Sequence, residues 1–219
     1  MDLKWYAHAD AKDVRSLLLD VHDEVYAGDP DPFHSRERFS YFVDLWSGRE
    51  DWTCVSGWED GRPVGYAYGS KFKPGGWWKG ADRPDGVRGR IFALSELMVV
   101  PRWQGTGRGR RIHDALVRAV EVDFVTLLVD SDHAKVQALY ERWGYEKRDE
   151  AKPSGDSPLY AVMVRDLAGD AAGRRIERDG LDELIAGFES VNGPADPAAV
   201  AVKRARLIAQ DPGGGAHEG

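Results

Sequence analysis

Cysteine is almost absent from this chain of 219 residues. The single cysteine, Cys54, excludes an internal disulfide framework and any metal site built from several thiolates. It stands in an apolar, strand-like run, where cysteine usually serves as a small core side chain and not as a nucleophile. Long apolar runs are also lacking, and the polar N-terminus has no signal-peptide core. The sequence therefore predicts a cytoplasmic protein that does not associate with a membrane.

Positive charge is in deficit, because 30 Lys and Arg residues face 37 Asp and Glu residues, for a net charge of −7. This balance argues against broad nucleic-acid binding. A nucleophile elbow is missing, so a Ser/His/Asp hydrolase is not predicted. No metal is predicted either, since metal-ligand spacing is not found among His8, His22, His34, His113 and His217.

Hydrophobic periodicity and turn residues divide the chain into one domain, residues 1–167, and a C-terminal helical extension with a flexible tail, residues 168–219. Helices are predicted at 10–26, at 35–48 and around 133–143. A further helix is predicted directly after the glycine-rich stretch at 101–111, which is described next. Strands are predicted at 3–7, 52–58, 63–72, 91–100, 124–129, 145–150 and 159–167. The extension could dock on the domain, mediate dimerisation or contact a partner, and docking is the favoured interpretation.

One stretch stands out by its glycines and arginines. An apolar strand runs into Pro-Arg-Trp-Gln-Gly-Thr-Gly-Arg-Gly-Arg-Arg at positions 101–111. Alternate glycines let the backbone curl and present successive N–H groups to one anion, and the following helix adds its positive N-terminal dipole. Four arginines lie here with no acidic residue among them. The stretch therefore predicts a phosphate-binding loop.

The spacing within this loop separates it from two common nucleotide motifs. The loop has no lysine, as a P-loop requires, and its glycines do not have the step of the dinucleotide fingerprint. Gln104, Gly107 and Gly109 do match Gln-x-x-Gly-x-Gly. This pattern resembles the pyrophosphate loop of the GCN5-related N-acetyltransferases, the GNAT family, which bind acetyl-CoA.

A second segment, from His133 to Tyr145, resembles the family signature Asn-x-x-Ala-x-x-Leu-Tyr-x-x-x-Gly-Phe. Its apolar residues predict the core face of a short helix: Val136, Leu139, Tyr140 and Trp143. His133 stands where the family has asparagine, and an imidazole could replace one contact of that amide. Tyr145 stands where the family has phenylalanine, a change expected to matter little.

The resemblance implies the GNAT acyltransferase fold, an α/β (α+β) architecture with a central mixed, mostly antiparallel sheet flanked by helices. It also implies acetyl-CoA as cosubstrate, wedged between the fourth and fifth strands, with the Val99 N–H facing the reacting carbonyl oxygen. The cofactor-binding residues implied in this way are Leu97, Met98, Val99, Gln104, Gly105, Thr106, Gly107, Arg108, Gly109, Arg110, His133 and Tyr140.

Two residues are candidates for catalysis. The resemblance places Tyr140 beside the thioester sulfur, where a phenol with a pKa of about 10 can protonate a thiolate; a core aromatic is the other interpretation. Glu96 lies in an apolar strand, where a carboxylate is costly unless paired or used. It is predicted to be the general base, to pair with an arginine such as Arg90, or to lie in a partly exposed position. We expect it to share a face of the strand with Leu94 and Met98.

Asp130 and Asp132 are alternative bases, although capping the next helix is the favoured role. Trp77 and Trp78, in a long loop at 73–86, either stack on a substrate or pin the loop to the core. The aromatic loop favours a small-molecule acceptor.

The sequence thus predicts an N-acetyltransferase that transfers an acetyl group from acetyl-CoA to a primary amine, directly and in a ternary complex. A protein N-terminus or lysine as acceptor, and a non-catalytic CoA-binding regulatory module, stay open. Nucleic-acid phosphate as ligand of the arginine loop is a third alternative. A homodimer is also left open.

Overall fold

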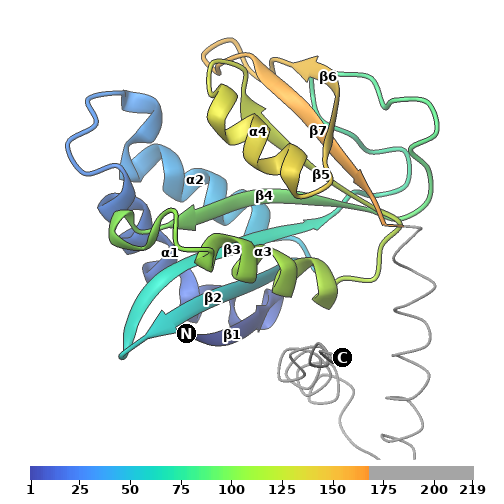
Figure 1. The fold of residues 1–219 in the computed structure, drawn as a ribbon. Coiled ribbons are helices and arrows are strands. Elements are labelled where there is room, and N and C mark those ends of the chain that lie inside the picture. Colours follow the sequence, from blue (N-terminus) through green and yellow to red (C-terminus); the bar gives the residue numbers. More distant parts are fainter. Residues whose placement is uncertain (168–219) are drawn as a thin grey trace, which may run out of the picture. The chain divides into compact units, whose positions relative to one another are not determined.

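A seven-stranded sheet forms the centre of residues 1–167, the part of the chain that the computed structural model describes (Figure 1). Its strand order is β1-β2-β3-β4-β5-β7-β6, and only the β4–β5 pair is parallel. The strands are β1 (Asp2–Ala7), β2 (Thr53–Glu59), β3 (Arg62–Lys71), β4 (Ile91–Val99), β5 (Phe124–Asp130), β6 (Glu146–Ala151) and β7 (Tyr160–Asp166). The predicted mixed, mostly antiparallel sheet is confirmed. The extension predicted for 168–219 lies outside the described residues.

Within residues 1–167, four α-helices flank the sheet, in the predicted order along the chain: α1 (Ala11–Val25), α2 (Arg36–Ser47), α3 (Arg108–Ala119) and α4 (Ala134–Arg142). One buried cluster joins α1 and α2 to Tyr66, Tyr68 and Met98 on one face of the sheet. Another joins α3 and α4 to the opposite face, through residues such as Ile112 and Tyr140. The sheet is therefore a middle layer between two helical layers.

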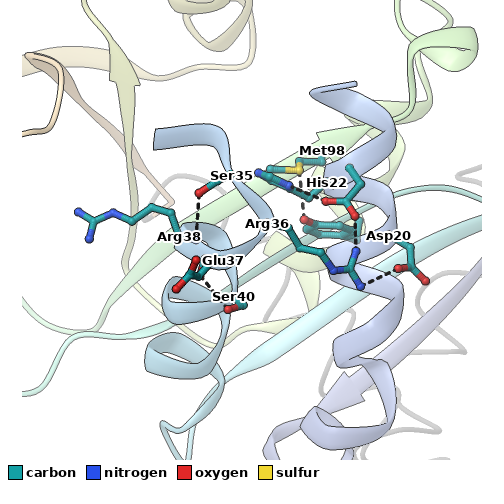
Figure 2. A network of polar contacts seen from close by, with 10 residues as sticks. Asp20, His22, Ser35, Arg36, Glu37, Arg38, Ser40 and Met98 are labelled. Atoms are coloured by element: carbon teal, nitrogen blue, oxygen red, sulfur yellow. Dashed lines mark hydrogen bonds and ion pairs between the residues drawn. The ribbon is translucent and has the colours of Figure 1, made fainter. Parts of the chain in front are cut away.

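The start of α2 is fixed by local polar contacts and by α1 (Figure 2). Ser35 is the N-cap, and its hydroxyl accepts a hydrogen bond from the Arg38 N–H at 3.3 Å. The Arg36 guanidinium binds Asp20 at 2.9 Å and also Asp23, both on α1. These contacts hold α2 against α1 on one face of the sheet.

Asp10, the first residue of the helix predicted at 10–26, does not cap α1 with its side chain. Asp10 does occupy the N-cap position, but its carboxylate makes no bond to the helix. It accepts a hydrogen bond from the Ala7 N–H at 2.9 Å instead. The side chain thus closes the turn between β1 and α1, a local competitor of helix capping.

Strand β4 carries a bulge at Ser95. Glu96 lies opposite Tyr68 of β3, whereas Leu94 lies opposite Gly69, so Ser95 has no partner. One extra residue reverses the alternation of side chains across the sheet. Leu94 therefore packs in the cluster with α3, while Met98 packs in the cluster with α1. The expectation that Glu96 shares a face with both Leu94 and Met98 is wrong for Leu94.

A long connection, residues 72–90, covers the sheet beside β5 and β7. The Trp78 indole N–H donates to Thr126 Oγ1 at 3.0 Å, and the Trp78 ring meets the Phe72 ring edge-on at 5.2 Å. Trp77 packs in the same cluster. These contacts show that both tryptophans pin the loop to the sheet, the second of the two predicted roles.

Candidate functional site

Strands β4 and β5 part after a short parallel pairing. Only Ile91, Phe92 and Ala93 pair with β5, at 124–126. From Leu94 onward, β4 has no ladder partner on that side, and Figure 1 shows the two strands diverging. Main-chain groups of the second half of β4 are therefore left without their sheet partner.

The direction of these groups follows from the β3–β4 ladder. The Val100 N–H donates to Val64 O at 2.9 Å, toward β3. Because main-chain groups alternate between the two sides of a strand, Met98 also faces β3, whereas Leu97 and Val99 face the side that β5 has left. The Val99 carbonyl accepts a hydrogen bond from Gln104 Nε2 at 2.9 Å.

Met98 is therefore placed differently from Leu97 and Val99. Its main chain faces β3, and its sulfur accepts a hydrogen bond from the Tyr66 hydroxyl at 3.1 Å (Figure 2). Met98 thus packs on the face of the sheet that α1 covers, and its main-chain groups do not face the space between β4 and β5. The main-chain groups of Leu97 and Val99 do face that space.

The loop between β4 and α3 has the backbone expected of an anion cradle. Gly105 and Gly107 have φ values of +72° and +80°, in the left-handed region that favours glycine. Gln104 and Thr106 brace the loop, because their side chains donate to the carbonyls of Val99 and Trp103.

The backbone N–H groups of this loop are available. Within the described residues, no acceptor meets the N–H groups of residues 105 to 110, and α3 begins its hydrogen-bond ladder with Arg111 N–H to Gly107 O at 3.1 Å. N–H groups gathered at a helix N-terminus bind phosphate. The loop therefore fits a pyrophosphate.

The arginines of the loop contribute less charge than the sequence suggests. Three of them bind carboxylates from elsewhere in the fold: Arg102 binds Glu24 at 2.9 Å, Arg108 binds Glu59 at 2.7 Å and Arg110 binds Asp114 at 2.6 Å. Arg108 also lies over the Trp103 ring, 3.9 Å from its centroid. Exposed Arg111 makes no ion pair with the described part of the chain. Anion attraction here therefore rests mainly on the backbone.

Helix α4 begins after His133 and carries Tyr140. His133 is exposed and occupies the N-cap position without a side-chain capping bond. Tyr140 is 8% exposed, and its hydroxyl forms no hydrogen bond with the described residues. Val136, predicted on the core face, is 39% exposed, because the first turn of α4 extends beyond the core. Tyr140 is thus a buried ring with a free hydroxyl.

Behind Tyr140 lies a buried polar chain that the sequence did not indicate. His113, fully buried on α3, lies 2.8 Å from Asp114 Oδ1 through Nδ1 and 2.8 Å from the Tyr145 hydroxyl through Nε2. An Nδ1–H bound to the carboxylate leaves Nε2 to accept from the Tyr145 O–H. Burial lowers the pKa of His113, which favours the neutral ring. Tyr145 is therefore not equivalent to the phenylalanine of the family pattern.

Glu96 is partly buried and has no cation beside it. Arg90, its predicted partner, instead binds Asp123 at 3.5 Å and Glu121 at 3.9 Å. Burial raises the pKa of Glu96 to about 7, and the Leu97 N–H lowers it to a smaller extent. A carboxylate with this pKa can take up or release a proton near neutral pH.

Tyrosines surround Glu96, and the sequence analysis missed most of them. Tyr68 lies opposite Glu96, and its ring stacks on that of Tyr66 at 5.8 Å. Burial, and to a smaller extent the Glu96 charge, raises the pKa of five hydroxyls, here called the tyrosine cluster: Tyr26, Tyr66, Tyr68, Tyr140 and Tyr160. The spacing of Tyr66 and Tyr68 in a predicted strand was the available signal, since residues two apart share a face.

Glu96, the open edge of β4 and the N–H cradle follow one another along β4 and the loop that leads into α3. A model of the acetyltransferase (GNAT) family matches residues 18–145, more than half of the chain. The chain belongs to the GNAT family. The family reaction is acetyl transfer from acetyl-CoA, and the free N–H groups of residues 105 to 110 fit its pyrophosphate.

Solved structures agree with the family fold. A GNAT-family protein from Desulfovibrio desulfuricans is 18% identical, with a TM-score of 0.52 over 76% of this chain and 100% of that chain. A histone acetyltransferase HPA2 and related acetyltransferase from Corynebacterium glutamicum is 18% identical, with a TM-score of 0.51 over 76% and 97% of the two chains.

The ribosomal-protein-S18-alanine N-acetyltransferase from Escherichia coli is 16% identical, with a TM-score of 0.50 over 75% of this GNAT protein and 94% of its own chain. At these identities the likeness shows the fold alone. No curated protein sequence matches this one significantly.

No described helix is long and apolar enough to cross a membrane. No group of three or more His, Cys, Asp or Glu side chains in residues 1–167 could hold a metal ion. The cytoplasmic location, the homodimer and the absence of nucleic-acid and membrane partners stay predictions.

Proposed function

We propose that this GNAT protein transfers the acetyl group of acetyl-CoA to a primary amine of a small molecule, directly and in a ternary complex. The observation that carries the proposal is the placement of Glu96. It is an unpaired carboxylate with a pKa of about 7 on the strand that leads into the N–H cradle. Tyr140 has a free hydroxyl and packs on the other face of the sheet. Burial and, to a smaller extent, the charge of Glu96 raise its pKa.

Residues of this chain would hold acetyl-CoA in two places. The N–H groups of residues 105 to 110 would bind the pyrophosphate, and the main chains of Leu97 and Val99 would bind the pantetheine arm. His133, exposed at the start of α4, is the candidate for a further contact to that arm. Acetyl-CoA supplies the acetyl group as a thioester.

The proton balance assigns roles to the two candidate catalytic residues. Attack by the amine nitrogen forms the new C–N bond and breaks the C–S bond, so the amine loses a proton and the thiolate gains one. The Glu96 carboxylate takes the proton of the amine. The Tyr140 hydroxyl is the candidate proton donor to the thiolate, because burial keeps the phenol neutral and its proton in place; solvent returns the proton to Tyr140 after CoA thiol is released.

Enclosure of the site supports a small acceptor over a protein. The Glu96 charge contributes to the raised pKa of two tyrosines: Tyr26, at the end of α1, and Tyr160, at the start of β7. The segments beside them are joined, since Arg38 of α2 binds Asp156 at 2.8 Å across 118 residues of sequence. An extended polypeptide entering between these segments would have to separate this ion pair.

Release of CoA thiol from acetyl-CoA, measured with and without a panel of primary amines, tests the proposal. We expect amine-dependent thiol release by the wild type and a loss of at least about a hundredfold in kcat for Glu96→Gln. Asp132→Asn, an exposed change near the end of β5, is the matched control and should keep full activity. If the wild type binds acetyl-CoA but acetylates no amine or peptide, the non-catalytic alternative is supported instead.

A further inference from the structure

A second carboxylate, Asp130, stands beside the tyrosine cluster. It is the last residue of β5 and lies directly opposite Tyr160 of β7. Burial raises the pKa of the Tyr160 hydroxyl to about 12, and the charges of Asp130, Glu96 and Asp156 add to the increase. Two of these carboxylates, Asp130 and Glu96, come from the two strands that part.

Asp130 differs from Asp29 and Asp156, and is like Glu96, because no side chain in residues 1–167 forms an ion pair with it. Asp29 binds His34 at 3.0 Å, and Asp156 binds Arg38 at 2.8 Å. Asp130 accepts one hydrogen bond, from the Asp132 N–H to Oδ1 at 2.9 Å, and has no ion pair in residues 1–167. The hydrogen bond in the turn before α4 uses one carboxylate oxygen of Asp130, and the negative charge of the side chain is not offset by an ion pair.

Two hydroxyls of the tyrosine cluster also lack partners. The side chains of Tyr68 and Tyr140 are 1% and 8% exposed, and neither hydroxyl has a hydrogen-bond partner in the described part of the chain. Neither oxygen is among the fully buried unpaired polar atoms of residues 1–167, so both stay accessible to water or a ligand. Hydroxyl oxygens accept hydrogen bonds from ammonium groups, which have donors only. These two hydroxyls therefore offer acceptors to a ligand with donors.

Two carboxylates beside the cluster carry charge that no ion pair offsets within residues 1–167. They are Glu96 and Asp130, whereas Asp29 and Asp156 are paired with His34 and Arg38. In a partly buried site, such a field favours a cation and disfavours a molecule that carries a carboxylate of its own.

The reacting amine must be neutral when it attacks, so it does not by itself offset the negative charge of these carboxylates. Resting on the proposed acetyl transfer, we infer that the acceptor is an aliphatic diamine or polyamine. Glu96 takes the proton of the reacting amine, while Asp130 binds a second, protonated ammonium of the same molecule. Asp130 is then a specificity-determining residue that touches the acceptor away from the reacting atoms.

Three amines with the same carbon chain test the inference: diaminobutane, butylamine and aminobutyrate. All three carry one primary amine, and they differ at the other end of the chain. Diaminobutane has a second ammonium there, butylamine has no charge and aminobutyrate has a carboxylate. We expect the wild type to prefer diaminobutane over butylamine by about tenfold in kcat/KM, as for an ion pair of intermediate burial. Aminobutyrate should be the poorest acceptor.

The variant Asp130→Asn removes the charge and keeps an oxygen for the Asp132 N–H. It should raise KM for diaminobutane about tenfold, leave kcat nearly unchanged, and leave butylamine kinetics as in the wild type. Asp132→Asn is the matched control, because it removes a charge two residues away without touching the bond to Asp130 Oδ1. It should leave the preference intact.

Titration of diaminobutane into the protein saturated with CoA gives a readout that does not depend on turnover. Binding that Asp130→Asn weakens and Asp132→Asn preserves supports the inference. Equal kcat/KM for diaminobutane and butylamine, equal losses for both in Asp130→Asn, or no diaminobutane binding at millimolar concentration would overturn it. If acetyl-CoA binds and butylamine is acetylated, such a failure leaves the proposed acetyl transfer standing. Failure of acetyl-CoA to bind defeats the proposed function itself.

Discussion

Glu96 lies directly opposite Tyr68 where β3 pairs with β4. The bulge at Ser95 creates this pairing, because without the extra residue the side chain of Glu96 would turn to the face covered by α3. Gly69 allows the bulge, since a Cβ at that position would come within 2.0 Å of Ala93 O. One irregular residue in β4 thus places the candidate base among the tyrosines.

The pH dependence of catalysis should follow the ionisation of Glu96. Its pKa is raised to about 7, so the carboxyl is protonated and unable to act as a base below that pH. We expect kcat/KM to rise with pH through about 7 and then level off. The residual activity of Glu96→Gln should lack this rise, which a pH series of thiol release measures. A wild-type profile that is flat between pH 5 and 8 would contradict the assignment.

The same ionisation should also affect stability. A carboxyl whose pKa is higher in the folded state than in the unfolded state binds more protons when folded, so it costs stability as pH rises from about 4.5 to 7. Glu96→Gln should therefore be more stable than the wild type at pH 8, by on the order of 1 to 3 kcal/mol. Urea unfolding at pH 5 and pH 8 checks this, and a constant difference between the two proteins would argue against it.

Tyr140→Phe should separate catalysis from binding. The hydroxyl makes no hydrogen bond to the described residues, so its removal should change the free energy of unfolding by about 0.5 kcal/mol or less. If it protonates the thiolate, kcat should fall by about a hundredfold while acetyl-CoA binding is kept. Thiol release and calorimetry on the same preparation measure both. An unchanged kcat would assign Tyr140 to the core alone.

Tyr145→Phe should destabilise the fold. The change leaves His113 Nε2 buried without a donor, and a buried unsatisfied group costs about 1 to 3 kcal/mol. Tyr160→Phe is a useful comparison, since the Tyr160 hydroxyl has no hydrogen-bond partner in the described part of the chain. Urea unfolding should show a larger loss for Tyr145→Phe, and equal losses would refute the structural role of the His113 bond.

The sequence allowed prediction of what depends on periodicity and spacing. The order of the helices and strands follows from residues close together in the chain. The glycine loop was recognised from the step between Gln104, Gly107 and Gly109. Each of these signals lies within a few residues, where local propensity decides structure.

The rest depends on contacts between distant segments. No local sequence pattern predicts the ion pair between Glu59 and Arg108 or the one between Arg38 and Asp156. The bulge at Ser95 is invisible to a pattern that assumes strict alternation, which is why the face of Leu94 was predicted wrongly.

The central claim is that the loop from Gly105 to Arg110 binds acetyl-CoA through its backbone. Gly107→Ala tests it, because φ is +80° and a Cβ there meets no other atom within 4 Å, so the change acts through backbone conformation alone. Gly86→Ala is the matched control, with φ of +87° and the same open surroundings in the connection at 72–90.

The decisive measurement is isothermal titration calorimetry with acetyl-CoA, CoA, ATP and NAD on the wild type and these two variants. The account predicts selective micromolar binding of acetyl-CoA and CoA, weakened about tenfold or more by Gly107→Ala and unchanged in Gly86→Ala. Absence of acetyl-CoA binding by the folded wild type, or equal binding by all three proteins, would contradict it.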